Sequence, residues 1–509
     1  MTSTFRRRGA GLALLTAIVL AGGGSPASQA PGPVVLIVVD GLRPDQVTPD
    51  VMPRLTALGG RGMVFERHHS VAPTVTRVNA SSIATGTYPE THGLLGNTVY
   101  SAATFPLKGV NTSSHEDLEA MERAEGRLLT AETLGRILAR AGKRLAVYSA
   151  GSSGSAYLLS HPLAEGGAVV NPDLVRPESL RAAVTKAAGP GPAEAVPNTA
   201  RNRWIVDAWQ ALAPTAVPAD VTIFWFGDPD ATAHATGLAS AQTVSALKAV
   251  DTEIGRIEEA LRSRGRLEST TLLVTSDHGF STHTSELKLP ALVAPFAETM
   301  PDGTPDLVVT EGAINFRRPA APARVSAIVR ALQARPEVGA LFTPAARAGA
   351  LEGREPGTLA FEAARWAHPR SAAILVSGNW SDAANQAGVA GTTTQGGVAG
   401  HGTTSPYDIH NTLIAAGPDV RRGARGVAPT SNADLAPTLL TLVGVPVPAS
   451  MTGRALTELH TTGPAPDALR VDRQVVAVRS TDGRYAVEAH LSTVAGRRYL
   501  DHTIVRRER

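Results

Sequence analysis

The 509-residue sequence contains no cysteine, and this absence narrows the chemistry open to the chain. Disulfide bonds, thiolate metal ligands and cysteine nucleophiles are all excluded. Any metal ion must therefore be held by imidazole nitrogen or by carboxylate or hydroxyl oxygen. Aromatic residues are also scarce, at 4% of the chain, so few rings are available for stacking against a ligand.

Long apolar runs are missing too. No stretch approaches the roughly 18 consecutive apolar residues of a membrane-spanning helix, so we expect no stable membrane span. The segment 1–30 has the basic run Arg6–Arg8, a short apolar stretch over about 11–21, and small residues towards Ala30. This order is typical of a secretory signal peptide and predicts export, either secretion or retention in a periplasm or cell envelope. An uncleaved anchor is the alternative, and the export route, general or twin-arginine, stays open.

Neither sign of charge is in excess once this segment is set aside. Three of the 48 basic residues and none of the 45 acidic residues lie in 1–30, which leaves 45 of each in the rest of the chain. Such a balance lacks the basic surplus of many nucleic-acid-binding domains, so we expect no nucleic acid duplex as a partner. The sequence leaves the oligomeric state open.

Apolar runs of strand length alternate with helical patterns. The strand-like runs lie at 34–39, 144–149, 221–226, 270–275, 306–310, 372–377 and 412–417. Helical patterns occupy 129–142, 200–212, 240–264, 322–334 and 432–444. Continuous apolar, β-branched runs are typical of strands buried on both faces. The alternation predicts an α/β fold with a doubly wound, mostly parallel central sheet flanked by helices.

Two segments rich in glycine, proline and alanine, 187–199 and 383–400, are predicted to be surface loops. The second is a candidate lid over a ligand. Near the C-terminus, an Asp-Gly pair at 482–483 separates strand-like stretches within 474–506, which predicts a small β hairpin.

Acidic and histidine side chains follow three of the strand-like runs. These residues are Asp40, Asp228, Asp230, His234, Asp277 and His278, and His401 lies later in a glycine-rich stretch. A single Asp after a strand is usually a turn residue or a helix cap. In open α/β sheets, however, ligands bind at the carboxyl ends of strands, so the whole set is better explained by convergence on one site. Mixed imidazole and carboxylate ligands predict two divalent ions, and zinc suits them best.

Motifs spread along the chain resemble those of one superfamily. In order they read "VVDGLRPD", "PTVTRVNASSIATGTYPETHGLLGN", "DPDATAHATG", "SDHGF" and "GHGT". Together they resemble the alkaline phosphatase superfamily, most closely its nucleotide pyrophosphatase/phosphodiesterase branch, and they are also similar to phosphonoacetate hydrolases. The resemblance implies a single alkaline phosphatase-like catalytic domain over 31–509, with variable insertions at about 101–200 and 285–370.

The resemblance also implies which residues bind the metal ions. One zinc ion would be held by Asp230, His234 and His401. The other would be held by Asp40, Asp277, His278 and the oxygen of the nucleophile.

Two threonines, Thr74 and Thr76, compete for the role of nucleophile at the start of a predicted helix. In the phosphodiesterases an Asn follows the nucleophile by three positions, which selects Thr76 with Asn79. A threonine hydroxyl needs a metal ion to lower its pKa, and a helix N-terminus offers free N–H groups to an anion. We expect Asn79 to donate to a substrate oxygen. Attack by Thr76 would give a covalent phosphothreonine, which water then hydrolyses.

The expected substrate is a small phosphorylated molecule, for which the resemblance suggests a nucleotide. The segment 72–82 lacks the motif of a sulfatase. The uncharged segment 150–160 offers no basic clamp for a doubly charged monoester, which favours diesters and pyrophosphates. Arg77 argues the other way, because it adds positive charge beside the nucleophile, unless it is a solvated arginine. A phosphomonoesterase, a phosphonoacetate hydrolase and a non-catalytic relative that binds metal or a phosphorylated ligand stay as alternatives.

Five other side chains near the motifs receive weaker assignments. His68 and His69 are predicted to be structural. The same holds for His92 and Asn97, which belong to the turn "THGLLGN". His283 is a candidate for a supporting position next to the metal ligands.

Overall fold

The structure is a computed structural model that describes residues 1–4 and 32–508. From Gly32 onward the chain forms one compact unit, and the fold below is that of this unit. All but the first four residues of the predicted signal peptide lie outside the described residues. Within the described part, no helix combines the length and the apolar character needed to cross a bilayer.

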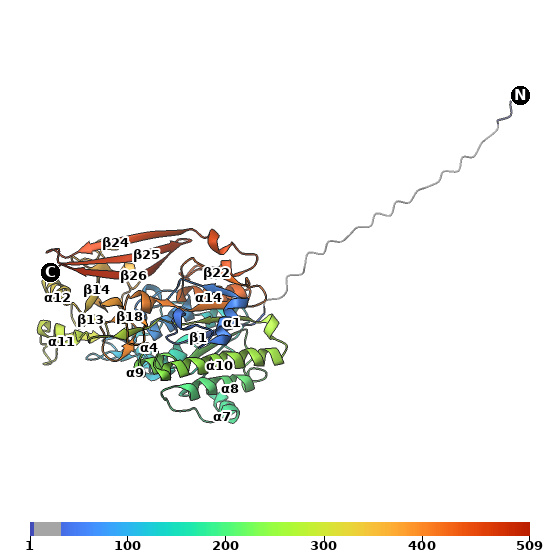
Figure 1. Ribbon diagram of the computed structural model, residues 1–509, viewed down its shortest axis with the longest axis horizontal. Helices are drawn as coiled ribbons and strands as arrows, with labels where there is room; N and C mark the ends of the chain where they lie inside the picture. Colours follow the sequence, from blue (N-terminus) through green and yellow to red (C-terminus); the bar gives the residue numbers. More distant parts are fainter. Residues whose placement is uncertain (5–31, 509) are drawn as a thin grey trace. The chain divides into compact units, whose positions relative to one another are not determined.

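A nine-stranded sheet forms the centre of the unit (Figure 1). Its strands, in spatial order, are β22 (Ala424–Gly426), β2 (Met63–Phe65), β21 (Leu413–Ala416), β10 (Thr271–Thr275), β1 (Val34–Val39), β9 (Val221–Phe226), β6 (Leu145–Ser149), β7 (Ala168–Asn171) and β8 (Leu174–Arg176). Only β21 and β8 run against the direction of the others. Every residue of β1 and β9 is buried, as expected of strands covered on both faces. The predicted doubly wound, mostly parallel sheet is confirmed.

Helices cover both faces of this sheet, and β1 shows why. Its odd-numbered residues, such as Ile37, pack into one apolar core with α1 (Pro53–Arg61), α7 (Arg181–Ala188), α8 (Thr199–Leu212) and α10 (Ala241–Ser263). Its even-numbered residues, such as Leu36, pack into a second core with α2 (Thr76–Thr85), α5 (Leu134–Arg140), α6 (Ser153–Leu159) and α14 (Leu435–Leu442). The alternation of side chains along a strand therefore builds a three-layer unit.

Two predicted strands belong to a different sheet from the one expected. The runs at 306–310 and 372–377 lie in a separate five-stranded sheet. It consists of β12 (Leu307–Thr310), β13 (Ala313–Phe316), β16 (Ile374–Gly378), β14 (Val338–Thr343) and β15 (Leu359–Ala360), and it packs on α11 (Leu289–Val293) and α12 (Pro322–Gln333). An apolar run shows that a strand is buried but not which sheet buries it, so the assignment to the central sheet was wrong.

The predicted loop at 383–400 contains three stretches of strand, 383–384, 390–393 and 399–400, separated by turns. It contains part of the hairpin β17 (Trp380–Ala384) and β18 (Ala390–Thr393), which joins β11 (Ser281–His283) and β19 (Ala399–Gly400) in a four-stranded sheet. Its glycines hid this strand pattern. Two further sheets are built from two-residue strands. One joins β3 (His68–His69) with β20 (His410–Asn411) and β23 (Thr430–Ser431), and the other joins β4 (Thr98–Val99) with β5 (Val110–Asn111). The remaining helices are α3 (Pro89–His92), α4 (His115–Glu125), α9 (Asp230–Thr236) and α13 (Pro406–Ile409).

The predicted C-terminal hairpin forms two of the strands of a three-stranded antiparallel sheet. It comprises β24 (Val471–Arg479), β25 (Tyr485–Val494) and β26 (Arg497–Arg507), which Figure 1 shows in red, away from α8 and α10. Buried polar groups join it to the rest of the unit. The Nε2 of His69 lies 3.0 Å from Asp501 in β26, and the neighbouring His68 contacts Thr430 and Asn432. Both histidines have the structural surroundings that the sequence suggested.

A buried ion pair also anchors this C-terminal sheet, and it yields a prediction. Arg454 pairs with Glu458 at 2.6 Å and donates through Nε to the Tyr499 hydroxyl at 3.1 Å. We expect Arg454→Leu to lower the free energy of unfolding by about 3–5 kcal/mol, because it leaves a carboxylate buried without its cation. Denaturant-induced unfolding measures this. The double change Arg454→Leu with Glu458→Leu should recover part of the loss; a double variant as unstable as the sum of the singles would contradict the assignment.

Candidate active site

Three neighbouring parallel strands bring the predicted acidic residues to one edge of the central sheet. Asp40 follows β1 and Asp277 follows β10, while Asp230 is the first residue of α9, just beyond β9. The spatial order β10, β1, β9 and their parallel pairing place the three strand ends side by side. Asp228 instead binds Asn202 and Thr232, so it shapes the loop between β9 and α9.

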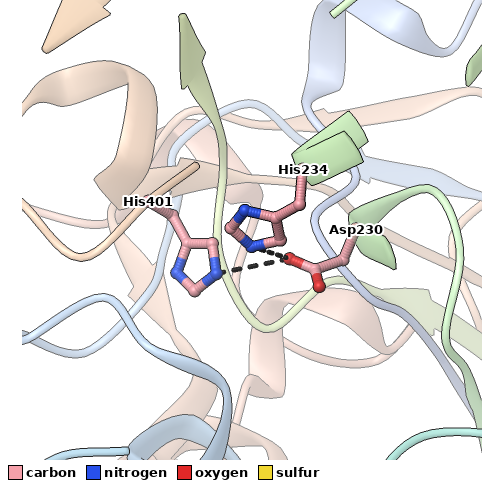
Figure 2. A group of neighbouring side chains, drawn as sticks. All are labelled: Asp230, His234 and His401. Atoms are coloured by element: carbon pink, nitrogen blue, oxygen red, sulfur yellow. Dashed lines mark ion pairs between the residues drawn. The ribbon is translucent and has the colours of Figure 1, made fainter. Parts of the chain in front are cut away.

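The side chains gather into two groups that share Asp230. In the first, the Nε2 atoms of His234 and His401 lie 3.2 and 3.3 Å from the Oδ1 of Asp230, as Figure 2 shows. The second joins Asp40, Asp230 and His278, whose ligand atoms all lie within 4.8 Å of one another. Asp277 completes it, with its Oδ2 3.1 Å from the Nε2 of His278. The structure thus brings together all six side chains that the sequence proposed as metal ligands.

Hydrogen bonds orient the three histidines for metal binding. Each Nδ1 lies 2.8–2.9 Å from a backbone carbonyl oxygen, which can only accept a hydrogen bond. The acceptors are Ala399 for His234, Gly279 for His278 and Thr74 for His401. In the neutral form of each ring Nδ1 therefore carries the proton, and Nε2 keeps a lone pair that faces the carboxylates.

Three carboxylate oxygens at this edge have no hydrogen-bond donor. They are Oδ1 of Asp40, Oδ1 of Asp230 and Oδ2 of Asp277, all buried. Buried carboxylate oxygens without a donor are costly unless a cation compensates them. Together with the free Nε2 atoms they form a donor set that fits divalent metal ions, and zinc accepts this mixture of nitrogen and oxygen.

The crowding of negative charge shifts the pKa values of the same groups. Burial and the neighbouring Asp277 and Asp230 raise the pKa of Asp40 well above its ordinary value. Burial, and after it the negative charge of Asp230, raises the pKa of Asp277 to about 7. Burial opposes protonation of His234, but the adjacent Asp230 outweighs it and raises that pKa to about 9. Protons thus take the place of metal charge when no ion is bound.

The hydroxyl of Thr76 faces the second group. Its Oγ1 lies 3.3 Å from the Nε2 of His278, and the residue is 5% exposed. Thr76 begins α2, and the preceding residue, Val75, makes no side-chain cap on the helix. The N–H of Arg77 in this first turn donates to Oδ1 of Asn97 at 2.9 Å, so an anion at this end would have only the N–H groups of the other first-turn residues.

The other threonine, Thr74, has its hydroxyl occupied. It donates to the carbonyl of Thr403 at 2.8 Å and accepts from the N–H of Gly402 at 3.0 Å. Since the carbonyl of Thr74 also holds His401, this residue fastens the glycine-rich loop to the start of α2. Of the two candidates, only Thr76 offers its hydroxyl to the group of ligands.

The expected substrate contact of Asn79 is wrong, because its amide is used inside the protein. Nδ2 donates to the carbonyls of Val71 and Val75, while Oδ1 accepts from the N–H of Val71 and from Asn432. No donor is left for a ligand. Asn79 instead holds the segment that leads into α2.

Asn97, assigned a structural role from the sequence, lines the cavity over the site. Its Oδ1 accepts from the N–H of Arg77 at 2.9 Å, which leaves Nδ2 for a ligand. Glu311 holds the loop from the other side, by accepting from the N–H of Asn97 at 3.0 Å. The "HGLLGN" turn predicted that Asn97 makes a hydrogen bond, but not that this bond reaches the residue after Thr76.

The cavity over these residues has a volume of about 420 Å³. His234 and His401 lie at one end, and the apolar walls include Leu95, Met121 and Trp366. His283 also lines it, with Nδ1 2.7 Å from the carbonyl of Gly396. His92 does not line it and instead contacts Ser82, as a structural residue should. The cavity suits a small molecule.

One further contact escaped the sequence-based reasoning. The indole Nε1 of Trp225, on β9, donates to Oδ2 of Asp40 at 2.9 Å. The contact fixes one oxygen of the carboxylate and leaves the other facing the cluster. A tryptophan in a continuous apolar run carries no signal for this role beyond the rule that buried indoles find an acceptor.

Comparison with known proteins agrees with this geometry. Residues 34–380 match the model of a protein family described as type I phosphodiesterase / nucleotide pyrophosphatase. The chain belongs to this family. The matched range contains α2 and all the candidate ligands except His401, which lies beyond its end. The resemblance found in the sequence motifs is thereby confirmed at the level of family.

Individual relatives are distant and longer. Mouse ectonucleotide pyrophosphatase/phosphodiesterase family member 3 is 25% identical over 249 residues, which is 48% of this chain and 25% of the relative. Venom phosphodiesterase 2 of Crotalus adamanteus is 25% identical over 256 residues, 50% of this chain and 27% of the relative. The chain thus spans about a quarter of the length of these two relatives.

A solved structure supports the fold. Murine ectonucleotide pyrophosphatase / phosphodiesterase 5 superposes with a TM-score of 0.56 at 17% identity, covering 82% of this chain and 96% of that one. An inactive variant of that murine protein in complex with AMP gives the same values. At this identity the likeness establishes the alkaline phosphatase-like fold.

The pKa shifts predict how the metal-free protein responds to pH. Asp277, at about 7, and His234, at about 9, both bind a proton more tightly in the folded chain than at their ordinary values of 3.8 and 6.5. Their stabilising contribution is complete at low pH and is lost as the pH rises through the folded values. We expect the melting temperature of the chelated protein to fall from pH 6.5 to 9, by on the order of 5 °C.

Thermal unfolding of chelated and zinc-loaded samples over this range provides the measurement. The zinc-loaded protein is the control, since bound ions replace the protons and should flatten the curve. Parallel curves for the two samples would show that these residues do not hold metal.

Proposed function

We propose that the chain is an exported, zinc-dependent hydrolase of phosphate esters that favours diester and pyrophosphate bonds and reacts through a phosphothreonine on Thr76. The observation that carries this proposal is the position of the Thr76 hydroxyl, at the first residue of α2 and 3.3 Å from Nε2 of His278. Membership of the phosphodiesterase family supports the reaction class. Export rests on the basic and apolar pattern of 1–30.

The ligand groups would hold two zinc ions. Asp230, His234 and His401 would bind one. Asp40, Asp277, His278 and the Thr76 oxygen would bind the other. When bound, such ions lower the pKa of a hydroxyl and stabilise negative charge on the attacking and leaving oxygens.

The other roles in the reaction belong to side chains and backbone groups around the start of α2. Oγ1 of Thr76 gives its proton to solvent and forms a bond to phosphorus, and the leaving oxygen departs with the electron pair of the bond that breaks. Nδ2 of Asn97 donates to the oxygens of the phosphoryl group, as do first-turn N–H groups of α2 other than that of Arg77, which is bound to Oδ1 of Asn97. Water then attacks phosphorus, the bond to Thr76 breaks, and its hydroxyl is restored. Thr74 and Asn79 keep the start of α2 and the His401 loop in register through the contacts described above.

The substrate is a small phosphorylated molecule, and nucleotides are the first to test. The cavity of about 420 Å³ accommodates a molecule of that size and excludes a nucleic acid duplex. The AMP complex of the murine structural neighbour gives independent support for nucleotides. A non-catalytic relative is disfavoured, because the nucleophile and the full set of ligands are present and converge.

A phosphomonoesterase is the second candidate, on the strength of one residue. Arg77 lies directly after the nucleophile, and among the described residues no carboxylate forms an ion pair with it within 4.0 Å. An unpaired cation at this place suits a substrate with more than one negative charge. Phosphonoacetate, which also carries several negative charges, is a third substrate to assay on the same grounds.

Variants of the two threonines test the nucleophile. We expect Thr76→Ala to reduce kcat by at least about 1,000-fold at unchanged zinc content, because the attacking oxygen is gone. Thr74→Ala is the matched control, and its loss should be much smaller since Thr74 only fastens a loop. A diester, a monoester, a sulfate ester and phosphonoacetate are assayed side by side, with zinc counted by elemental analysis. Wild-type activity in Thr76→Ala would overturn the assignment.

A further inference from the structure

Arg77 directly follows the proposed nucleophile in α2, and its guanidinium has no hydrogen-bond or ion-pair partner among the described residues. Its backbone N–H is bound to Asn97, but its side chain makes no hydrogen bond to the described residues, and Nε is buried. Buried guanidinium groups in proteins are almost always paired or hydrogen-bonded. A group left in this state next to a phosphoryl site is prepared for a ligand that brings its own acceptor.

The charges around Arg77 define what that ligand must be. The groups that act on it are the carboxylates of Glu311, Asp40, Asp230 and Asp277. The three aspartates belong to the proposed metal site, where two divalent ions would more than balance them. Glu311 then remains as the one uncompensated anion, and it is hydrogen-bonded to the backbone of Asn97 rather than to the guanidinium.

We propose that Arg77 binds a second negative charge of the substrate. Within the proposed activity, Arg77 then adds to the rate on substrates with two negative charges at, or one phosphoryl group away from, the phosphorus that Thr76 attacks. Monoesters carry the second charge on the same phosphoryl group, and pyrophosphates carry it on the next one. Simple diesters have a single charge and gain nothing from Arg77. This inference rests on the proposed function and names its substrate class.

The geometry also explains how the residue is held in place without a salt bridge. The first turn of α2 fixes the backbone of Arg77, and Asn97 binds its N–H. Glu311 fixes Asn97 in turn, from the tight turn between β12 and β13, where its φ is +50°. These contacts fix the backbone of Arg77 without using its guanidinium donors, which stay free for a ligand.

A substrate comparison in zinc-loaded protein tests the proposal. The three probes are bis-para-nitrophenyl phosphate, para-nitrophenyl phosphate and diadenosine pyrophosphate. Arg77→Met keeps the volume and removes the charge, and we expect it to lower kcat/KM for the monoester or the pyrophosphate about 10- to 100-fold more than for the diester. Arg77→Lys should recover part of the difference. If kcat/KM falls more for the monoester, Arg77 binds the second charge on the attacked phosphoryl group; if it falls more for the pyrophosphate, Arg77 binds the charge on the next one.

Two controls separate this role from a structural one. Arg354 is exposed in the adjoining cavity, which shares Tyr100 and Asn315 with the first, so Arg354→Met tests whether any nearby arginine has the effect. Glu311→Gln keeps the acceptor for Asn97 and removes the competing charge. It should increase the preference for doubly charged probes. If Arg77 and Glu311 were only a structural pair, both variants would lose activity on all probes alike.

A binding measurement gives a second readout. Inorganic phosphate is titrated calorimetrically into zinc-loaded Thr76→Ala, with and without Arg77→Met. We expect the dissociation constant to rise about tenfold or more in the double variant. Equal phosphate affinity, or an equal loss on all three substrates, overturns the proposal. A wild-type protein without activity on any phosphate ester would instead overturn the proposed function itself.

Discussion

Three carboxylates lie close together in a buried place, and the rest of the site depends on this one constraint. Asp40, Asp230 and Asp277 each have an oxygen without a donor at the edge of the central sheet. Such an arrangement is unfavourable in an apolar interior unless positive charge is supplied. The raised pKa values of Asp40 and Asp277 express the same cost in protons. The fold maintains this arrangement because the buried strands β10, β1 and β9 pair in parallel and end side by side, which places the three carboxylates at the same edge.

Surrounding contacts turn the cluster into a directed site. A backbone carbonyl accepts a hydrogen bond from Nδ1 of each histidine, so every Nε2 faces the carboxylates. The indole of Trp225 fixes one oxygen of Asp40 and leaves the other free. Thr74 joins the loop of His401 to the start of α2, which aims the hydroxyl of Thr76 at the cluster. Most of these contacts join a side chain of the site to a main-chain group of the fold, so the fold itself sets the geometry of the site.

Charge near the nucleophile connects this site to its substrate. The family and the metal ligands specify phosphoryl chemistry, but they do not separate singly from doubly charged esters. Arg77 lies where that distinction is made, and Glu311 opposes it from the cavity wall. The balance between these two side chains, rather than the metal centre, would then set the substrate preference. This effect of Arg77 and Glu311 is confined to the site, since both residues are held by contacts of their own backbones and of neighbouring residues.

The sequence by itself determined the α/β class, the main strands and the convergence of acids and histidines, because apolar runs and strand-end residues are local signals. It also separated Thr76 from Thr74, although the reason offered, the spacing to Asn79, proved structural. Only the tertiary structure decided which sheet received the strands at 306–310 and 372–377, and that parts of 383–400 pair as strands. It alone showed Asn79 occupied, Asn97 facing the cavity and Arg77 unpaired, since the partners of Asn79 and Asn97 lie up to 353 positions away. Hydrogen-bond partners and unpaired charges are settled by packing between distant segments, and no local pattern encodes them.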